Sequence, residues 1–131
     1  MSYAPLLLPG QHFSHTTAAG ILGLRMPDGF REQTIHVTSL APDRAPRGRG
    51  ITGHQTDRDI QLFITRSGLL VPHPIDVWCQ LSTLLTMDDL IVMGDGLIRR
   101  KEPWATSEQL NRAVDQWHGM RGAKRLAAAT Y

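Results

Sequence analysis

Hydrophobic and polar residues alternate along much of the first half of the chain. In residues 33–40, the apolar Ile35 and Val37 fall on one face and polar side chains fall on the other. This period of two predicts a half-buried strand. Residues 51–55 are expected to form another short strand, because they lack a helical period.

A β-hairpin is the clearest local signal in the sequence. Residues 60–64 alternate again, and the turn Arg66-Ser67-Gly68 leads into an apolar run at 69–71. Two short apolar segments that flank a glycine-containing turn are typical of paired antiparallel strands. We therefore expect these two segments to pair.

Helical signals stand at the start of the chain and after the prolines at 72 and 74. Ser14 is expected to cap a short helix over residues 15–22. A helical period then places four large apolar side chains on one face of a second helix. These are Trp78, Leu81, Leu84 and Leu85.

Three more helices are expected toward the C-terminus. Thr86 should cap the first, whose opening turn carries Asp88 and Asp89, where the helix dipole favours negative charge. Thr106 or Ser107 should cap the next helix. Residues 121–129 are expected to form a last, weakly apolar helix. Strands followed by helices predict an α+β fold with a short N-terminal helix, a small antiparallel or mixed sheet and C-terminal helices.

Length and composition predict one domain over residues 1–131, since a chain of 131 residues can bury a core of its own. Within it we expect an extended arm at 1–10, a helix with strands at 11–72 and a helical part at 73–131. The net charge of +2 does not by itself argue for nucleic acid or membrane. One cysteine, no signal-peptide pattern and no long apolar run favour a cytoplasmic protein without membrane contact.

Motifs for common chemistries are incomplete. No acidic residue is followed two places later by lysine, which argues against a metal-dependent nuclease site of the restriction type. Residues 48–53 match G-x-G-x-x-G, but a β-like segment follows instead of a helix, which favours loop glycines over a dinucleotide site. Cys79 lies beside Trp78 in an apolar helix and is expected to be a small core residue.

The six histidines are spread along the chain, and only His12 and His15 stand within three residues of each other. Because no Cys/His motif with ligand spacing exists, we expect isolated histidines and predict neither a metal site nor a bound cofactor. No complete catalytic motif is present, so the sequence predicts a chain that is not an enzyme. A hydrolase or cofactor enzyme built around Cys79 or the glycine motif is the least favoured alternative.

Arginines are the strongest candidates for contact with a partner. A first group surrounds the 41–50 loop and could bind phosphate or an acidic surface through bidentate guanidinium groups. A second group follows the helix that Thr86 begins, and the polar pair at the start of the first helix could present donors to an anion. These candidates are Arg44, Arg47, Arg49, Arg58, Arg99, Arg100, Ser14 and His15.

In order along the chain, several short segments resemble a family of actinobacterial proteins, the abortive-infection (AbiEi-like) antitoxins. Those proteins often carry an endonuclease-like domain related to very-short-patch repair enzymes. The resemblance spans about residues 11–126 and includes Ser14-His15-Thr16-Thr17-Ala18-Ala19, His36-Val37-Thr38, Arg47-Gly48-Arg49-Gly50, Gly53-His54, Ser67-Gly68-Leu69-Leu70-Val71 and Arg121-Gly122-Ala123.

Two departures from the family pattern limit what the resemblance implies. It implies a winged helix-turn-helix before the matching region and, in many members, the endonuclease-like domain after it, and neither is recognisable here. The resemblance therefore implies a central, non-catalytic interaction module. Its partners would be a cognate toxin, a second copy of the chain, or the backbone of double-stranded DNA. The alternative is the accessory N-terminal part of a very-short-patch-repair-like endonuclease without its catalytic domain.

Overall fold

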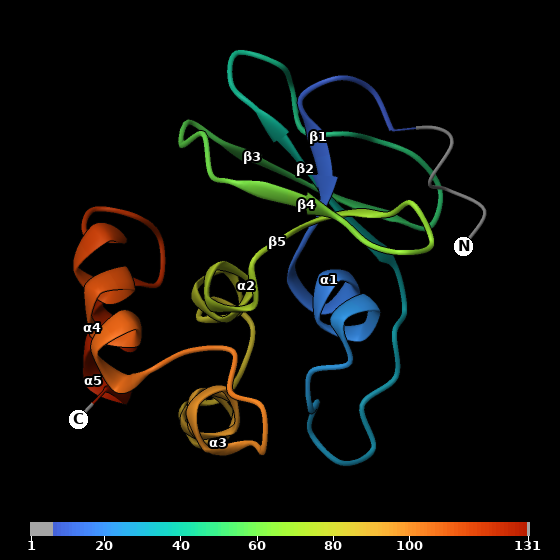
Figure 1. Ribbon diagram of the computed structural model, residues 1–131. Helices are drawn as coiled ribbons and strands as arrows, with labels where there is room; N and C mark the ends of the chain where they lie inside the picture. Colours follow the sequence, from blue (N-terminus) through green and yellow to red (C-terminus); the bar gives the residue numbers. More distant parts are fainter. Residues whose placement is uncertain (1–6, 131) are drawn as a thin grey trace.

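The computed structural model describes residues 7–130 and confirms an α+β architecture (Figure 1). Its strands are β1 (Gln11–Phe13), β2 (Ile35–Leu40), β3 (Ile51–Thr56), β4 (Leu62–Ile64) and β5 (Leu70–Pro72). Its helices are α1 (His15–Leu22), α2 (Pro74–Leu81), α3 (Met87–Arg99), α4 (Ser107–Gln116) and α5 (Ala123–Ala129). Of the arm expected at 1–10, residues 1–6 lie outside the described part of the chain.

The strands form a mixed three-stranded sheet and a separate hairpin. The order in the larger sheet is β1-β2-β3, with β1 antiparallel and β3 parallel to β2. The register of the parallel pair places Thr38 opposite His54. Strands β4 and β5 pair antiparallel, which confirms the hairpin expected from the sequence. Strand β1 was not expected, because three residues are too few to show a period.

A loop, rather than a helix, connects the two parallel strands. It occupies residues 41–50 and lies so close to β3 that a Cβ atom on Gly53 would stand 1.9 Å from the carbonyl oxygen of Pro46. Only glycine leaves room for that approach. Because β3 begins at Ile51, the glycines of residues 48–53 belong to a loop and a strand, as expected.

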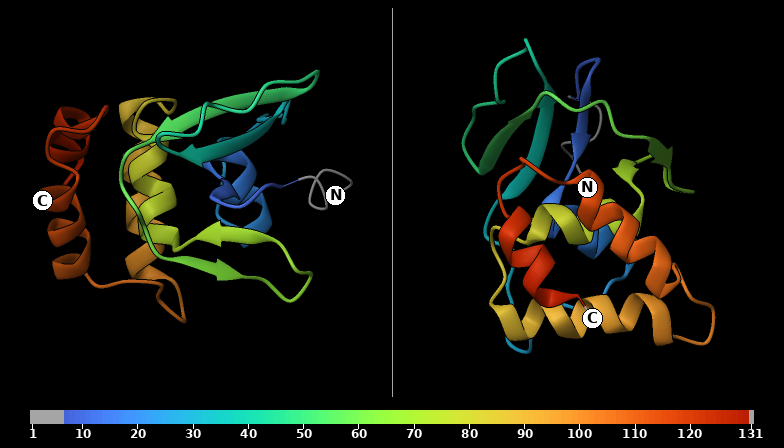
Figure 2. Two further views of the ribbon diagram at one scale, coloured as in Figure 1. Left: turned by 90° about the horizontal axis from the view of Figure 1, so that it is seen from above. Right: turned by 90° about the vertical axis from the view of Figure 1, so that its left-hand side faces the viewer.

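Helix α2 lies at the centre of the molecule. It contacts α1, α3, α4 and β5, and helices α3, α4 and α5 lie on the side away from the three-stranded sheet (Figures 1 and 2). The core includes Phe13, Val37, Trp78 and Leu90, all essentially inaccessible to solvent. Cys79 is also buried within α2, which confirms its assignment as a core residue.

Caps explain where the C-terminal helices begin. The hydroxyl of Thr86 accepts a hydrogen bond from the backbone N–H of Asp89, and Thr106 forms a reciprocal capping box with Gln109. Each arrangement satisfies N–H groups that lack a partner inside the helix. The caps expected at these two threonines are therefore confirmed.

The expected face of the second helix was wrong at one position. Helix α2 ends at Leu81, and the hydroxyl of Ser82 donates to the carbonyl oxygen of Cys79 at 2.6 Å. Beyond that end the helical period no longer applies, so Leu84 is 48% exposed whereas Leu85 is buried. At this break the carbonyl oxygen of Cys79 accepts from both the backbone N–H and the hydroxyl of Ser82.

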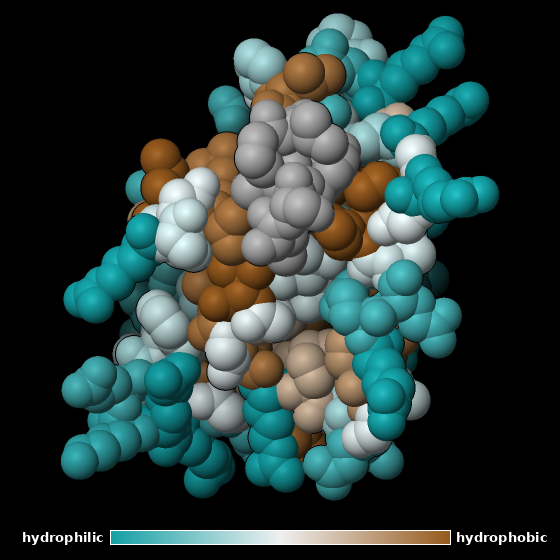
Figure 3. All heavy atoms as spheres, turned by 90° about the vertical axis from the view of Figure 1, so that its right-hand side faces the viewer, coloured by the Kyte–Doolittle hydropathy of each residue, from teal (hydrophilic) through white to brown (hydrophobic). Residues whose placement is uncertain are grey.

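The surface is mixed. Hydrophobic residues gather in a band on one face, with long hydrophilic side chains at its edges (Figure 3). No helix in the described part of the chain combines the length and hydropathy that crossing a membrane requires.

Candidate metal centre

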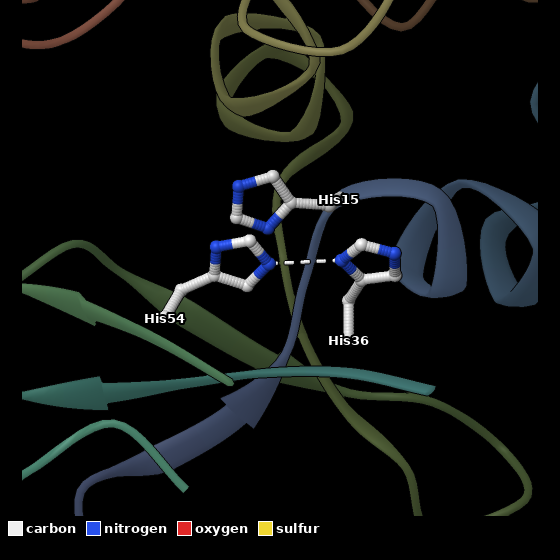
Figure 4. Close-up of side chains that lie close together, drawn as sticks. All are labelled: His15, His36 and His54. Carbon is white, nitrogen blue, oxygen red and sulfur yellow. Dashed lines mark hydrogen bonds between the residues drawn. The ribbon is translucent and has the colours of Figure 1, made fainter. Parts of the chain in front are cut away.

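Three histidines from different parts of the sequence meet beside the parallel strands. They are His15, His36 and His54, and each offers a ring nitrogen that lies within 4.8 Å of the other two. Figure 4 shows the His15 ring over the pair formed by His36 and His54. This grouping corrects the expectation of isolated histidines.

The register of the parallel strands brings two of these rings together. His36 lies on β2 and His54 on β3, where His54 is paired with Thr38, two residues beyond His36. Residues two apart on a strand point to the same face, so both imidazoles stand on one side of the sheet. Their ring planes are stacked, with centroids 5.1 Å apart.

The third ring comes from the first residue of α1. His15 has φ of 54°, a left-handed conformation that is uncommon for residues other than glycine. Its ring stacks on His54 with centroids 3.7 Å apart and lies 5.6 Å from the ring of His36. Strained backbone at a residue that faces a polar cluster is a common mark of a functional site.

Hydrogen bonds fix the His15 ring and its backbone. Nδ1 of His15 lies 2.8 Å from the hydroxyl oxygen of Ser14, and the hydroxyl of Thr38 donates to that same oxygen at 2.6 Å. The backbone N–H of His15 donates to Oε1 of Gln80 on α2 at 3.1 Å. These partners hold the ring in one orientation, as outer-shell groups do around metal ligands.

A second network holds β2 against α1. The backbone N–H of His36 donates to the hydroxyl oxygen of Thr17 at 2.8 Å. Thr16 and Thr17 in turn donate their hydroxyls to Oε1 of Glu32. The polar side chains of α1 therefore bond this helix to the strand that carries His36.

Burial keeps these imidazoles neutral. It lowers the pKa of His15 to about 2, helped by the neighbouring rings of His54, His36 and His12. It lowers the pKa of His54 to about 4, with further contributions from His36 and Arg121. The pKa of His36 is lowered by burial too, although Glu32 opposes the shift. Neutral imidazole is the form that binds a metal ion.

The spacing of the three rings suits one metal ion. Zinc–nitrogen bonds of roughly 2.0–2.1 Å in a tetrahedral site separate ligand nitrogens by about 3.3 Å. Nδ1 of His36 and Nε2 of His54 lie 2.8 Å apart, joined by a hydrogen bond, and no pair of ligand nitrogens exceeds 4.8 Å. To bind one ion together with the other two, the His15 ring would have to turn out of its stack on His54, so that its nitrogen lone pair faces the same point. A metal ion would replace the single proton that now joins His36 to His54.

The cluster borders a cleft of about 750 Å³. Polar side chains from several elements line it, among them His15, His54, Thr38, Gln80 and Arg121. A larger hollow of about 910 Å³ lies between α4 and α5 and shares Arg121 with the cleft. We favour the smaller one as the site, because two of the three clustered histidines line it.

The arginines that the sequence analysis proposed as partner contacts do not form one group in the structure. Arg44, Arg47 and Arg49 are exposed on the 41–50 loop, and within residues 7–130 none of them has an ion-pair partner. Arg58 stands apart from them, because it donates to the carbonyl oxygen of Gln116 and its guanidinium lies 5.8 Å from the centre of the Trp117 ring.

The remaining candidates have local partners. Arg99 is paired with Asp95 at 3.7 Å, and the guanidinium of Arg100 lies 5.1 Å from the centre of the Trp104 ring. Ser14 is fully buried and His15 is 8% exposed. Ser14 therefore has no surface from which to contact an external anion. Of all the candidates, only His15 belongs to the histidine cluster.

Sequence spacing could not reveal the cluster, because 21 and 18 residues separate its members in order along the chain. No signal within a single segment of the sequence links His15, His36 and His54. Comparison with known proteins adds nothing further: no protein-family model matches the chain, and neither curated proteins nor solved structures include a significant match.

Proposed function

We propose that this chain is a metal-binding protein whose ion is held by His15, His36 and His54. The convergence of three neutral imidazoles within 4.8 Å of one another is the observation that carries the proposal. Imidazole nitrogen is the ligand that zinc, copper and nickel accept readily. Three protein ligands and a neighbouring cleft are also the arrangement of zinc sites that bind an exchangeable fourth ligand.

A simpler interpretation is that the three histidines form a purely structural cluster, held by ring stacking and one hydrogen bond. Two observations favour a ligand set over it. The left-handed backbone of His15 costs energy, and placing one buried and two half-buried imidazoles side by side loses solvation that apolar side chains would not need. A bound ion would offset these costs, because it would be held by all three rings.

The direct test is a titration of the purified chain, first freed of metal with a chelator, with Zn²⁺ or Co²⁺. We expect saturation at one ion per chain and, for Co²⁺, the visible absorption of a four-coordinate centre. His36→Gln and His54→Gln should each weaken binding by more than about a hundredfold, since even outer-shell changes cost 10–100-fold. His15→Asn should do the same while retaining a residue that tolerates the left-handed backbone.

His118→Gln is the matched control, because His118 is exposed and lies outside the cluster. It should bind the metal as the unaltered chain does. Circular dichroism of each variant separates loss of a ligand from loss of the fold. Folded variants that bind as tightly as the unaltered chain, or no saturable binding at all, would contradict the proposal.

We propose, as a second candidate function, that the 41–50 loop contacts a partner through Arg44, Arg47 and Arg49. Their exposure and their lack of carboxylate partners among residues 7–130 support it. The partner would be the backbone of double-stranded DNA or the acidic surface of a cognate protein, as the resemblance to antitoxins implies. This role is compatible with a metal centre on another part of the same sheet.

Binding to duplex DNA across a salt series tests the second candidate. If the loop contacts phosphates, Arg47→Ala/Arg49→Ala should weaken binding. The slope of the logarithm of the binding constant against the logarithm of the salt concentration should also become shallower by about two. Arg112→Ala is the control, since it removes an exposed arginine from α4 instead. No binding by the unaltered chain at low salt would exclude DNA and leave an acidic protein as the partner to seek.

A further inference from the structure

We infer that the cleft beside the three histidines binds an oxyanion of the phosphate type, held by the metal ion and by Arg121. This inference rests on the proposed metal centre and names its exchangeable ligand. Arg121 lines the cleft together with His15 and His54. Arg121 lies close enough to His54 for its positive charge to act on that ring.

The side chain of Arg121 is available for a ligand. The residue is exposed, and within residues 7–130 its guanidinium has no ion-pair partner. The contact that Arg121 makes with the rest of the fold comes from its backbone, because its carbonyl oxygen accepts a hydrogen bond from Nε1 of Trp117 at 3.2 Å. The backbone is positioned independently of the guanidinium, so the side chain can be replaced without removing that contact.

The local backbone also fixes where Arg121 stands. The next residue, Gly122, has φ of 89°, and a Cβ atom added to it would lie 2.0 Å from the hydroxyl oxygen of Ser82. The segment therefore packs directly against the end of α2, which also supplies Gln80 to the cleft. An arginine on a constrained segment loses less freedom on binding than one on a free loop.

The charges of the cleft select an anion. With a divalent ion on the histidines, the metal and Arg121 outweigh the one carboxylate that lines this cleft, Asp57. Phosphate suits the pair because its oxygens point in several directions. One oxygen can take the open position on the metal while others accept the parallel hydrogen bonds of a guanidinium fork. The hydroxyls of Thr38 and Thr83 also line this cleft.

The experiment uses the full chain loaded with Co²⁺ and inorganic phosphate as the probe. Binding of Co²⁺ is measured first, without phosphate, so that failure of the metal centre is seen separately. Phosphate should then change the visible spectrum of the bound Co²⁺ and broaden the phosphorus resonance of the added anion in a saturable manner. Acetate at equal concentration should bind more weakly.

Arg121→Gln should raise the dissociation constant of phosphate by about ten- to a hundredfold, the range expected for lost hydrogen bonds to a charged group. It should not weaken the binding of Co²⁺, because it removes a positive charge from beside His54. Lys124→Gln is the matched control, because it removes a nearby exposed cation that does not line this cleft. The inference fails if Co²⁺ binds but phosphate leaves its spectrum unchanged. Equal phosphate affinity in Arg121→Gln, or equal affinity for acetate and phosphate, would also overturn it.

Discussion

His12 shows how burial of a single side chain makes the stability of the whole fold depend on pH. The residue is 4% exposed, on β1, and its Nε2 lies 3.4 Å from Nε2 of Gln80. Burial lowers the pKa of His12 from 6.5 to about 4. The unfolded chain therefore takes up a proton on this residue at a higher pH than the folded chain does. The free energy of unfolding falls as pH drops through that window.

The corresponding prediction concerns urea unfolding of the metal-free chain at several pH values between 6.5 and 4. His12→Gln should make the decline shallower, by up to ~1.4 kcal/mol per pH unit, because one titrating group is removed. His118→Gln, which also replaces one histidine by glutamine but at an exposed position, is the matched variant for comparison. Equal slopes for the unaltered chain and His12→Gln would show that His12 does not titrate in this way.

Single residues also mark what the sequence could not reveal. Ser14 stands at the cap position that the sequence predicts, but its side chain makes no capping hydrogen bond. Its hydroxyl bonds instead to His15 and to Thr38, 24 residues away. Cap propensity is a local property, whereas the choice of partner depends on which strand lies beside the helix. The sequence therefore predicted the position of Ser14 and not its role.

Among the elements, those with a clear period or a strong cap were predictable. The hairpin of β4 and β5, strand β2 and the starts of α3 and α4 follow from alternation, a glycine turn and two threonine caps. The end of α2 did not, because a hydrophobic period from Trp78 to Leu85 hides the break at Ser82. The pairing of β2 with β3 joins segments that are distant in the sequence, so no pattern within either segment predicts it.

The end of α2 gives a matched pair of substitutions. Leu81 is 0% exposed in the core, whereas Leu84 is 48% exposed beyond the helix end. Leu81→Ala should therefore lower the free energy of unfolding by roughly 2–5 kcal/mol, and Leu84→Ala by much less. Urea unfolding of both variants tests this, and similar losses would mean that α2 continues past Leu81.

At the scale of the whole molecule, the candidate site exists only because distant segments fold together. Its three histidines come from α1, β2 and β3, and Gln80 from α2 bonds to the backbone of His15. The class of fold was predictable from local patterns, but the site was not, because no pattern within one segment contains it. The arginines singled out by the sequence are mostly exposed, as isolated charges usually are.

The close approach of Pro46 to Gly53 links strand alignment to ligand geometry. His54 follows Gly53 directly, and a slip of one residue between β2 and β3 would send its ring to the opposite face of the sheet. A side chain at position 53 would force Pro46 or β3 to move, directly beside His54. If the three histidines bind an ion as proposed, its binding would indicate that β3 has paired with β2 in the native register.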